Sequence, residues 1–286
     1  MGAADIVPGV SGGTIAFITG IYDELVQSIA SINLRHVKAG LSIAWPMRTQ
    51  SQRRADLSTL SQVNWVFFLP LVLGIFSAAL SLSRLIHLLL EQYLVLTYSF
   101  FFGLILVSIW FPFQGVEKRW RDILALIVVA TGSFFLFDPD LKLAGSQTPL
   151  ALFGSGALAI CALVLPGISG SYILVLLGQY KIVLAAISQR ELPTIFYFGL
   201  GMLVGLFSFI RVLKFILKHY RSTTMACLTG LMIGSLRVIW PFHYQSSTSN
   251  TPVAAIATLM LLGVAVILGL ESLSRFQRQS KLESKV

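Results

Sequence analysis

The sequence predicts an all-α integral membrane protein made of two repeats that insert with opposite orientations. Of its 286 residues, 56% are hydrophobic and 12% are charged, and the mean hydropathy of +0.81 lies far above that of soluble domains. The motif Pro-Gly-x-Ser-Gly occurs twice within apolar sequence, at residues 8–12 and 166–170. Each copy precedes three long apolar runs, so each half is expected to contain one re-entrant helical hairpin and three transmembrane helices.

The two motifs lie in longer stretches that match each other. Residues 8–22 and 166–180 align at an offset of 158 and share Pro, Gly, Ser, Gly, Gly and Tyr at corresponding positions. A duplication of this kind indicates two copies of one architecture. In lipid, Pro and Gly can break a helix only where the freed backbone groups are buried in protein or face a water-filled cavity. Broken apolar segments at corresponding places in two halves indicate the binding site of a transporter.

The first half is expected to cover about residues 1–140. Only seven residues precede the first motif, too few to cross a bilayer, so the segment 1–22 is predicted to enter and leave on one side. Residues 24–42 are weakly amphipathic and are expected in the membrane interface, and the polar residues 47–62 are expected to form an exposed loop. Three crossings are predicted near 65–83, 93–111 and 123–137, of which the second ends at Pro112.

The second half is expected to cover about residues 149–272. An apolar arm at 149–165 leads to the second motif, and a return arm follows at 171–180. Three further crossings are predicted near 195–215, 223–240 and 252–271, followed by a basic tail at 273–286. Nothing resembles a soluble unit that could fold alone, so residues 1–286 are predicted to form a single transmembrane domain.

The duplication continues in the long apolar runs. Gly74–Ser77 matches Gly205–Ser208 at an offset of 131, and Gly103–Ile109 matches Gly230–Leu236 at an offset of 127. These offsets are smaller than that of the two motifs because the first half carries a longer basic loop. The matches therefore pair the crossings of one half with those of the other.

The basic residues predict how the chain is oriented in the membrane. Because three is an odd number of crossings, the second half is inverted relative to the first. With this topology, 16 of the 21 Lys and Arg residues fall on the side that carries the loop at 24–64. The positive-inside rule makes this side, and with it the C-terminal tail, cytoplasmic. The net charge is +9, and the basic side chains are then expected to contact anionic lipids of the bilayer and not nucleic acid.

The two motifs have the chemistry of an anion-binding site. Glycine lets backbone N–H groups approach a ligand closely, and the first N–H groups of a helix have no partner within it. Hydroxyl side chains supply further donors, and such a group of donors suits phosphate oxygens. The candidate residues are Ser11, Gly12, Gly13, Thr14, Ser169, Gly170, Ser171 and Tyr172. The two tips are expected to meet near the midplane and to surround one anion, with close helix packing as the alternative role of the glycines.

Five polar residues within or at the ends of apolar segments are further candidates. An acid is costly in lipid, and Asp5 is expected to bind a proton, pair with a cation or cap the freed N–H groups of the turn. Arg211 and Arg237 are expected to neutralise a phosphate, with snorkelling to the interface as the alternative. Ser108 and Ser235 occupy matching positions and are expected either to line the cavity or to hydrogen-bond between helices.

Common catalytic motifs are missing from the sequence. It contains no phosphate-binding loop of the ATPase type, no His-Glu metal motif, no hydrolase nucleophile motif and no pair of redox cysteines. Cys161 and Cys227 lie in apolar stretches and are expected to be buried thiols. The chain is therefore predicted to have no catalytic residue, no metal ligand and no cofactor. Coupling to a proton or a sodium ion is not assigned to any residue.

Several segments resemble the signature of a known family. They are Met1–Phe17 with Gly20-Ile21-Tyr22, Leu165–Ser171 and Gly230–Arg237. These segments are similar to those of the bacterial DUF368 membrane proteins, and the resemblance covers nearly the whole chain. It implies transport of a polyprenyl phosphate, undecaprenyl phosphate, across the cytoplasmic (inner) membrane for reuse in cell-envelope synthesis. It also supports Asp5, the two Ser-Gly tips and Arg237 as site residues.

Two other functions are compatible with the same residues. A carrier for a small anion such as phosphate or sulfate would use the same donors, and a membrane-embedded enzyme acting on a lipid phosphate would bind the same headgroup. An apolar cavity that opens laterally toward lipid would favour a lipid substrate over a small anion. Release of phosphate by the purified protein would favour the enzyme.

Overall fold

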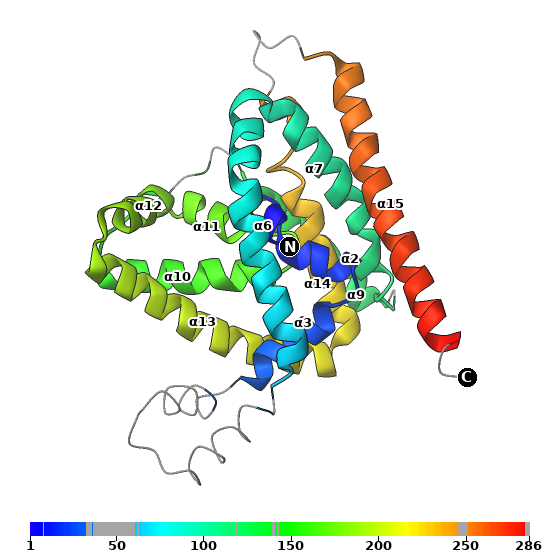
Figure 1. The fold of residues 1–286 in the computed structure, drawn as a ribbon, viewed down its shortest axis with the longest axis horizontal. Coiled ribbons are helices and arrows are strands. Elements are labelled where there is room, and N and C mark those ends of the chain that lie inside the picture. The colour runs from blue at the N-terminus through cyan, green and yellow to red at the C-terminus, as the bar shows by residue number, and fades with distance from the viewer. Residues whose placement is uncertain are drawn as a thin grey trace.

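The structure, a computed structural model, describes residues 1–7, 9–32, 36, 61, 63–117, 119–138, 141, 143–244 and 251–283, with side chains up to residue 272. Within these residues every regular element is a helix. In chain order they are α1 (Gly2–Ile6), α2 (Gly12–Ile18), α3 (Tyr22–Ser31), α6 (Trp65–Gln92), α7 (Leu94–Ser108), α8 (Trp110–Phe113), α9 (Trp120–Leu136), α10 (Pro149–Val164), α11 (Gly170–Leu176), α12 (Tyr180–Gln189), α13 (Leu192–His219), α14 (Arg221–Ser235), η1 (Pro241–Tyr244) and α15 (Val253–Glu283). Figure 1 shows α10 to α13 grouped on one side of the molecule and α15 along the opposite edge.

Several helices are long and apolar enough to cross a membrane, which makes this a multi-pass membrane protein. They are α6, α7 together with α8, α13, and the first 20 residues of α15. α9 and α14 lie at the two other predicted crossings but contain 17 and 15 residues, fewer than the ~20 that a bilayer core requires. The second crossing is also interrupted earlier than predicted, because α7 ends at Ser108 and Pro112 lies inside α8.

The predicted interfacial segment is only partly described. α3 covers the start of the amphipathic stretch 24–42, and its side chains Tyr22, Leu25 and Val26 are buried in a cluster with residues of α13 and α14. The apolar face of α3 is therefore covered by protein. Most of the remaining stretch and of the predicted loop 47–62 lies outside the described residues.

The backbone follows the same course at the two motifs. Gly9 and Gly167 have φ angles of 87° and 85°, a left-handed conformation that glycine adopts without strain. α1 ends before the first motif and α2 begins within it, and the same holds for α10 and α11 at the second motif. No helix therefore runs through either motif.

A second matched turn follows each short helix. α2 and α11 contain seven residues each, and the chain then turns at Gly20 and Gly178, whose φ angles are 71° and 67°. At the second of these turns the axes of α11 and α12 differ by 108°. The duplicated sequence thus forms duplicated local structure.

The long helices of the two halves also correspond. α6 and α13 contain 28 residues each, α7 and α14 contain 15 each, and both pairs are offset by 127 residues. Counted from the helix ends, Gly74 corresponds to Gly201, whereas the sequence match at an offset of 131 pairs it with Gly205. The two alignments differ by one helical turn.

Helices from the two halves interleave. α9 packs along α14 and α7 packs along α15, so each pair joins one helix from each half. A Cβ at Gly103 would overlap the carbonyl group of Met260, and a Cβ at Gly230 would lie 2.7 Å from the carbonyl oxygen of Leu126. These two glycines are a matched pair in the sequence, so a small residue permits close helix packing at the same place in both halves.

The substitution Gly201→Ala is expected to destabilise the protein, whereas Gly74→Ala at the corresponding position of α6 is not. A Cβ at Gly201 would overlap the carbonyl group of Phe153 in α10, and a Cβ at Gly74 would meet no atom within 4 Å. Overpacking of this kind costs about 1–3 kcal/mol. Thermal unfolding of the two purified variants in detergent tests the prediction, and equal melting temperatures would contradict the packing of α10 on α13.

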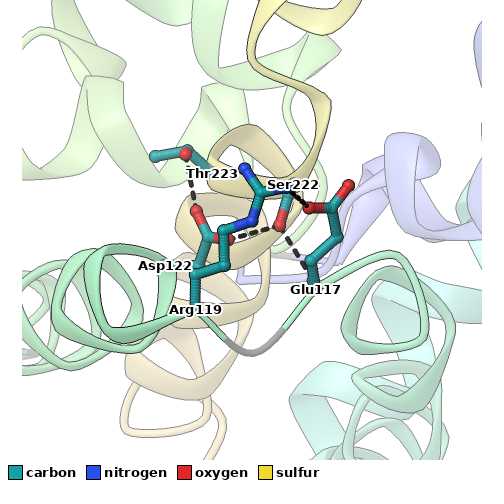
Figure 2. Close-up of polar contacts among 5 residues, drawn as sticks. All are labelled: Glu117, Arg119, Asp122, Ser222 and Thr223. Atoms are coloured by element: carbon teal, nitrogen blue, oxygen red, sulfur yellow. Dashed lines mark hydrogen bonds and ion pairs between the residues drawn. The ribbon is translucent and has the colours of Figure 1, made fainter.

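A polar cluster ties the start of α9 to the start of α14 (Figure 2). Asp122 lies in the first turn of α9, ahead of the apolar run, and its carboxylate accepts hydrogen bonds from the hydroxyls of Ser222 and Thr223 at 2.5 and 2.6 Å. The Ser222 hydroxyl also accepts a hydrogen bond of 2.8 Å from the backbone N–H of Glu117, which forms an exposed ion pair with Arg119. The cluster therefore adds polar contacts to the packing of α9 on α14.

The contribution of Asp122 to stability is expected to disappear in acid. The hydroxyl hydrogen bonds from Ser222 and Thr223 lower the pKa of its carboxyl group. A carboxyl group whose pKa is lowered by folding stabilises the protein above its unfolded pKa of about 3.9, and this contribution is lost as the pH falls through the folded pKa.

Asp122→Asn is therefore expected to lower the melting temperature at neutral pH, and the difference from the wild type should close below about pH 4. Melting temperatures measured in detergent over this pH range test the prediction. Glu117→Gln is the control, because its exposed ion pair contributes little. A difference that does not change with pH would show that the charge of Asp122 has no such role.

Candidate functional site

The two motifs contact each other directly. The hydroxyl of Ser11 donates a hydrogen bond of 2.9 Å to the carbonyl oxygen of Leu165. The hydroxyl oxygen of Thr14 accepts one of 3.1 Å from the backbone N–H of Gly167. Both hydroxyl-bearing side chains are completely buried. Segments about 150 residues apart in the chain thus meet in the interior of the helix bundle.

Asp5 caps the start of α2. Its carboxylate accepts a hydrogen bond of 2.6 Å from the N–H of Gly12, while the N–H of Gly13 donates to the hydroxyl of Ser11 at 3.1 Å. Three roles were expected for Asp5. In the structure it has one of them, because its carboxylate caps a freed N–H group of the turn. A side chain at position 12 would collide with the carboxylate, which explains the need for glycine there.

The second tip forms a different set of contacts. The hydroxyl oxygens of Ser169 and Ser171 are 2.6 Å apart and share a hydrogen bond. The N–H of Tyr172 donates a long bond of 3.5 Å to Ser169, and the Tyr172 hydroxyl donates to the carbonyl oxygen of Asp138 at 3.3 Å. Through Tyr172 the second tip thus contacts the end of α9.

Arg237 lies beside this second tip. Its Nη2 forms an ion pair of 2.6 Å with the carboxylate of Asp138, and its Nη1 donates to the carbonyl oxygen of Phe134 at 2.8 Å. The guanidinium carbon lies 4.7 Å from the centre of the Phe134 ring, which adds a cation–π contact. Arg237, Asp138 and Tyr172 therefore form one polar group, in which the arginine charge is already paired.

Sequence reasoning missed the part of Asp138 in this group. Asp138 follows the third predicted crossing directly and was not among the candidate residues. A signal was present, because an arginine at the end of an apolar segment needs a counter-charge, and few acids lie near apolar segments in this chain. The sequence did not reveal which acid pairs with Arg237, since the two residues are 99 positions apart.

The other candidates do not join the tips in this structure. Arg211 is exposed, and its Nη1 donates to the carbonyl oxygen of Phe207 in its own helix at 3.0 Å. The buried hydroxyls of Ser108 and Ser235 donate to carbonyl oxygens one turn earlier in their own helices, at 2.6 and 2.8 Å. Within the described residues, no hydrogen bond or ion pair links these three side chains to the motifs, so their role in a site stays a prediction.

An open apolar pocket of about 290 Å³ adjoins the second motif. Gly170, Ser171 and Leu174 of α11 line one part of it, and mostly apolar side chains of α10, α12 and α13 line the rest. Leu184 and Ile187 belong to this lining and are 52% and 58% exposed. The pocket is therefore open to the surface of the helix bundle.

The described residues contain no group of three His, Cys, Asp or Glu side chains that could hold a metal ion. Cys161 and Cys227 are unpaired and partly buried thiols. The chemical groups of the candidate site are therefore the hydroxyl, carboxylate, guanidinium and backbone N–H groups described above.

Comparison with known proteins identifies relatives of this chain. The model of the undecaprenyl phosphate translocase-like family matches residues 1–257. The polyprenyl-phosphate transporter of Vibrio cholerae serotype O1 is 39% identical over 95% of this chain and 93% of its own length. The polyprenyl-phosphate transporter of Staphylococcus aureus is 31% identical over 84% of this chain and 83% of its own length. No solved structure matches the chain. The chain belongs to the undecaprenyl phosphate translocase-like family, the DUF368 family that its motifs resemble.

Proposed function

We propose that this protein transports polyprenyl phosphate, specifically undecaprenyl phosphate, across the bacterial cytoplasmic (inner) membrane, and so recycles the lipid carrier of cell-envelope synthesis. The two relatives above are polyprenyl-phosphate transporters that match most of the chain. The structural observation that carries the proposal is the open, apolar pocket beside the second motif. Such a pocket suits a prenyl chain better than a small anion, which has no apolar surface to remove from water.

In this proposal the phosphate binds between the two tips and the prenyl chain lies in the pocket. Ser171 connects the two parts, because it lines the pocket and shares a hydrogen bond with Ser169. The donors are the eight tip residues of the two motifs together with Arg237. Arg211, Ser108 and Ser235 are retained as candidates for the path of the headgroup.

Carboxylates occupy two of the proposed phosphate donors in this structure. Asp5 accepts from the N–H of Gly12, and Asp138 accepts from Arg237. In this proposal a phosphate accepts from the same donors, and each carboxylate that it displaces moves away from it, because adjacent negative charges repel each other.

We infer an inverted repeat with two re-entrant hairpins. Three observations support it: the matched φ angles at the motif glycines, the 108° bend between α11 and α12, and the interleaving of α9 with α14 and α7 with α15.

The distribution of basic residues favours a cytoplasmic C-terminal tail. Transport then occurs when one half rocks against the other around the shared site. A coupling ion, either a proton or sodium, is not assigned to any residue.

A vesicle assay tests this function. The purified protein is reconstituted into sealed vesicles that contain polyprenyl phosphate, and a soluble phosphatase is added outside. In protein-free vesicles the phosphatase reaches only headgroups in the outer leaflet. With the active protein, headgroups from the inner leaflet also become accessible and are hydrolysed.

The variants Ser11→Leu and Ser169→Leu test the tip site in the same assay. Both are expected to leave the inner-leaflet headgroups protected, because each removes a hydroxyl donor and places a larger apolar side chain where the two tips contact each other. If both variants expose these headgroups as the wild type does, the site at the tips is wrong. Phosphate release without added phosphatase would instead identify an enzyme, and uptake of inorganic phosphate into the vesicles would identify a small-anion carrier.

A further inference from the structure

A second pocket, separate from the candidate transport site, is lined by residues of α3, of the end of α13 and of the start of α14. Figure 1 labels these three helices, and α3 packs against α13. Its volume is about 320 Å³, and it shares no lining residue with the apolar pocket beside the second motif. Val26 of α3 and Leu217 of α13 are buried apolar residues of its lining. Its remaining lining residues are polar or charged, so the pocket combines an apolar floor with a charged rim.

The rim carries a net positive charge. Arg221, the first residue of α14, forms an ion pair of 2.8 Å with Asp23 of α3, which balances one acid against one base. Lys214 and Lys218 also line the pocket, four residues apart on one face of α13. Both are exposed, and neither has an ion-pair partner in the described part of the chain. Two positive charges are therefore left to attract an anion.

The corresponding helix in the first half shows that the fold does not require these lysines. At the offset of 127 residues, Lys214 and Lys218 correspond to His87 and Glu91 of α6. His87 Nε2 lies 3.0 Å from Glu91 Oε1, so the polar side chains at these two positions of α6 pair with each other. The unpaired positive charge is thus a property of the α3–α13 pocket and not of the repeated architecture.

The position of the pocket indicates the kind of anion. Lys214 and Lys218 lie in the last two turns of α13, a membrane-crossing helix, and therefore near the membrane interface. Lysine binds phosphate as a point charge, and basic pockets between membrane helices bind anionic lipid headgroups. We propose that this pocket binds the phosphate headgroup of an anionic phospholipid, whose acyl chains lie in the adjoining bilayer. The position of the two lysines at the end of a membrane-crossing helix favours a lipid headgroup over free phosphate.

Lipid binding to the purified full-length protein in detergent tests the proposal. Native mass spectrometry measures binding of short-chain phosphatidylglycerol. Phosphatidylcholine of the same chain length is the comparison, because its headgroup is zwitterionic and has no net charge. The double variant Lys214→Gln/Lys218→Gln is expected to weaken phosphatidylglycerol binding by on the order of tenfold or more. Lys214→Arg/Lys218→Arg should keep the binding, and the matched control His87→Gln/Glu91→Gln should not change it.

The outcomes separate the lipid from other ligands. The proposal is overturned if the lysine-to-glutamine variant binds phosphatidylglycerol as the wild type does, or if phosphatidylcholine binds equally well. It is also overturned if inorganic phosphate displaces the lipid at equal concentration, because the pocket would then be a site for free phosphate. The substituted side chains are exposed, so all variants should elute as folded protein. The measurement does not depend on transport, so it stands or falls separately from the proposed function.

Discussion

Replacing Arg237 with glutamine is expected to reduce polyprenyl-phosphate transport roughly 10- to 100-fold, because a hydrogen bond to a charged group contributes about 1.5–3 kcal/mol. Arg237 lies beside the second tip and contacts Asp138 and Phe134. Glutamine keeps a donor but removes the charge that the proposed phosphate would meet. The phosphatase assay in vesicles measures the effect. Arg84→Gln is the control, since this exposed arginine of α6 is not part of the proposed site.

The ion pair with Asp138 offers a sharper test, because the two charges can be exchanged. The double variant Arg237→Asp/Asp138→Arg keeps an ion pair but moves its positive end from one element to the other. If Arg237 has only a structural role, the exchange should restore both the melting temperature and the transport activity that are lost when Arg237 alone is replaced. If Arg237 binds the phosphate, the exchange should restore stability but not transport. Full transport by the exchanged protein would therefore refute the role proposed for Arg237.

The parts of the fold that sequence reasoning predicted correctly are those that local chemistry determines. Proline and glycine restrict the backbone wherever they occur, so the duplicated motif predicted a break in the helices at both places. The left-handed φ angles of Gly9 and Gly167 and the serine caps of α2 and α11 follow from the same residues. Long apolar runs likewise predicted the membrane helices, because backbone groups in lipid must bond within the helix.

The parts that could not be predicted depend on contacts between distant residues. The pairing of Arg237 with Asp138, and of Asp122 with Ser222 and Thr223, joins residues about 100 positions apart. Residue types alone do not reveal such partners. The alignment of α6 with α13 also differs by one helical turn between the sequence match and the helix ends. Helix ends show a similar limit, since apolar composition continued beyond the points where α7 and α14 end.

The contact between the two motifs leads to the second large expected effect. Thr14→Val keeps the shape of the side chain but removes the oxygen that accepts from the N–H of Gly167. That N–H is buried and would be left without an acceptor, at a cost of about 1–3 kcal/mol. The variant is therefore expected to melt at a lower temperature and to lose transport, because Gly167 holds the turn that places the second tip.

The matched control is Thr229→Val in α14. Thr229 is also almost fully buried, and its hydroxyl donates to the carbonyl oxygen of Met225 one turn earlier at 2.7 Å. Removing that hydroxyl leaves a carbonyl group inside a regular helix, so little stability should be lost. The two substitutions are chemically identical, and only the first removes a bond between the two halves. If both variants melt and transport alike, the direct contact of the two motifs contributes neither to the fold nor to the transport site.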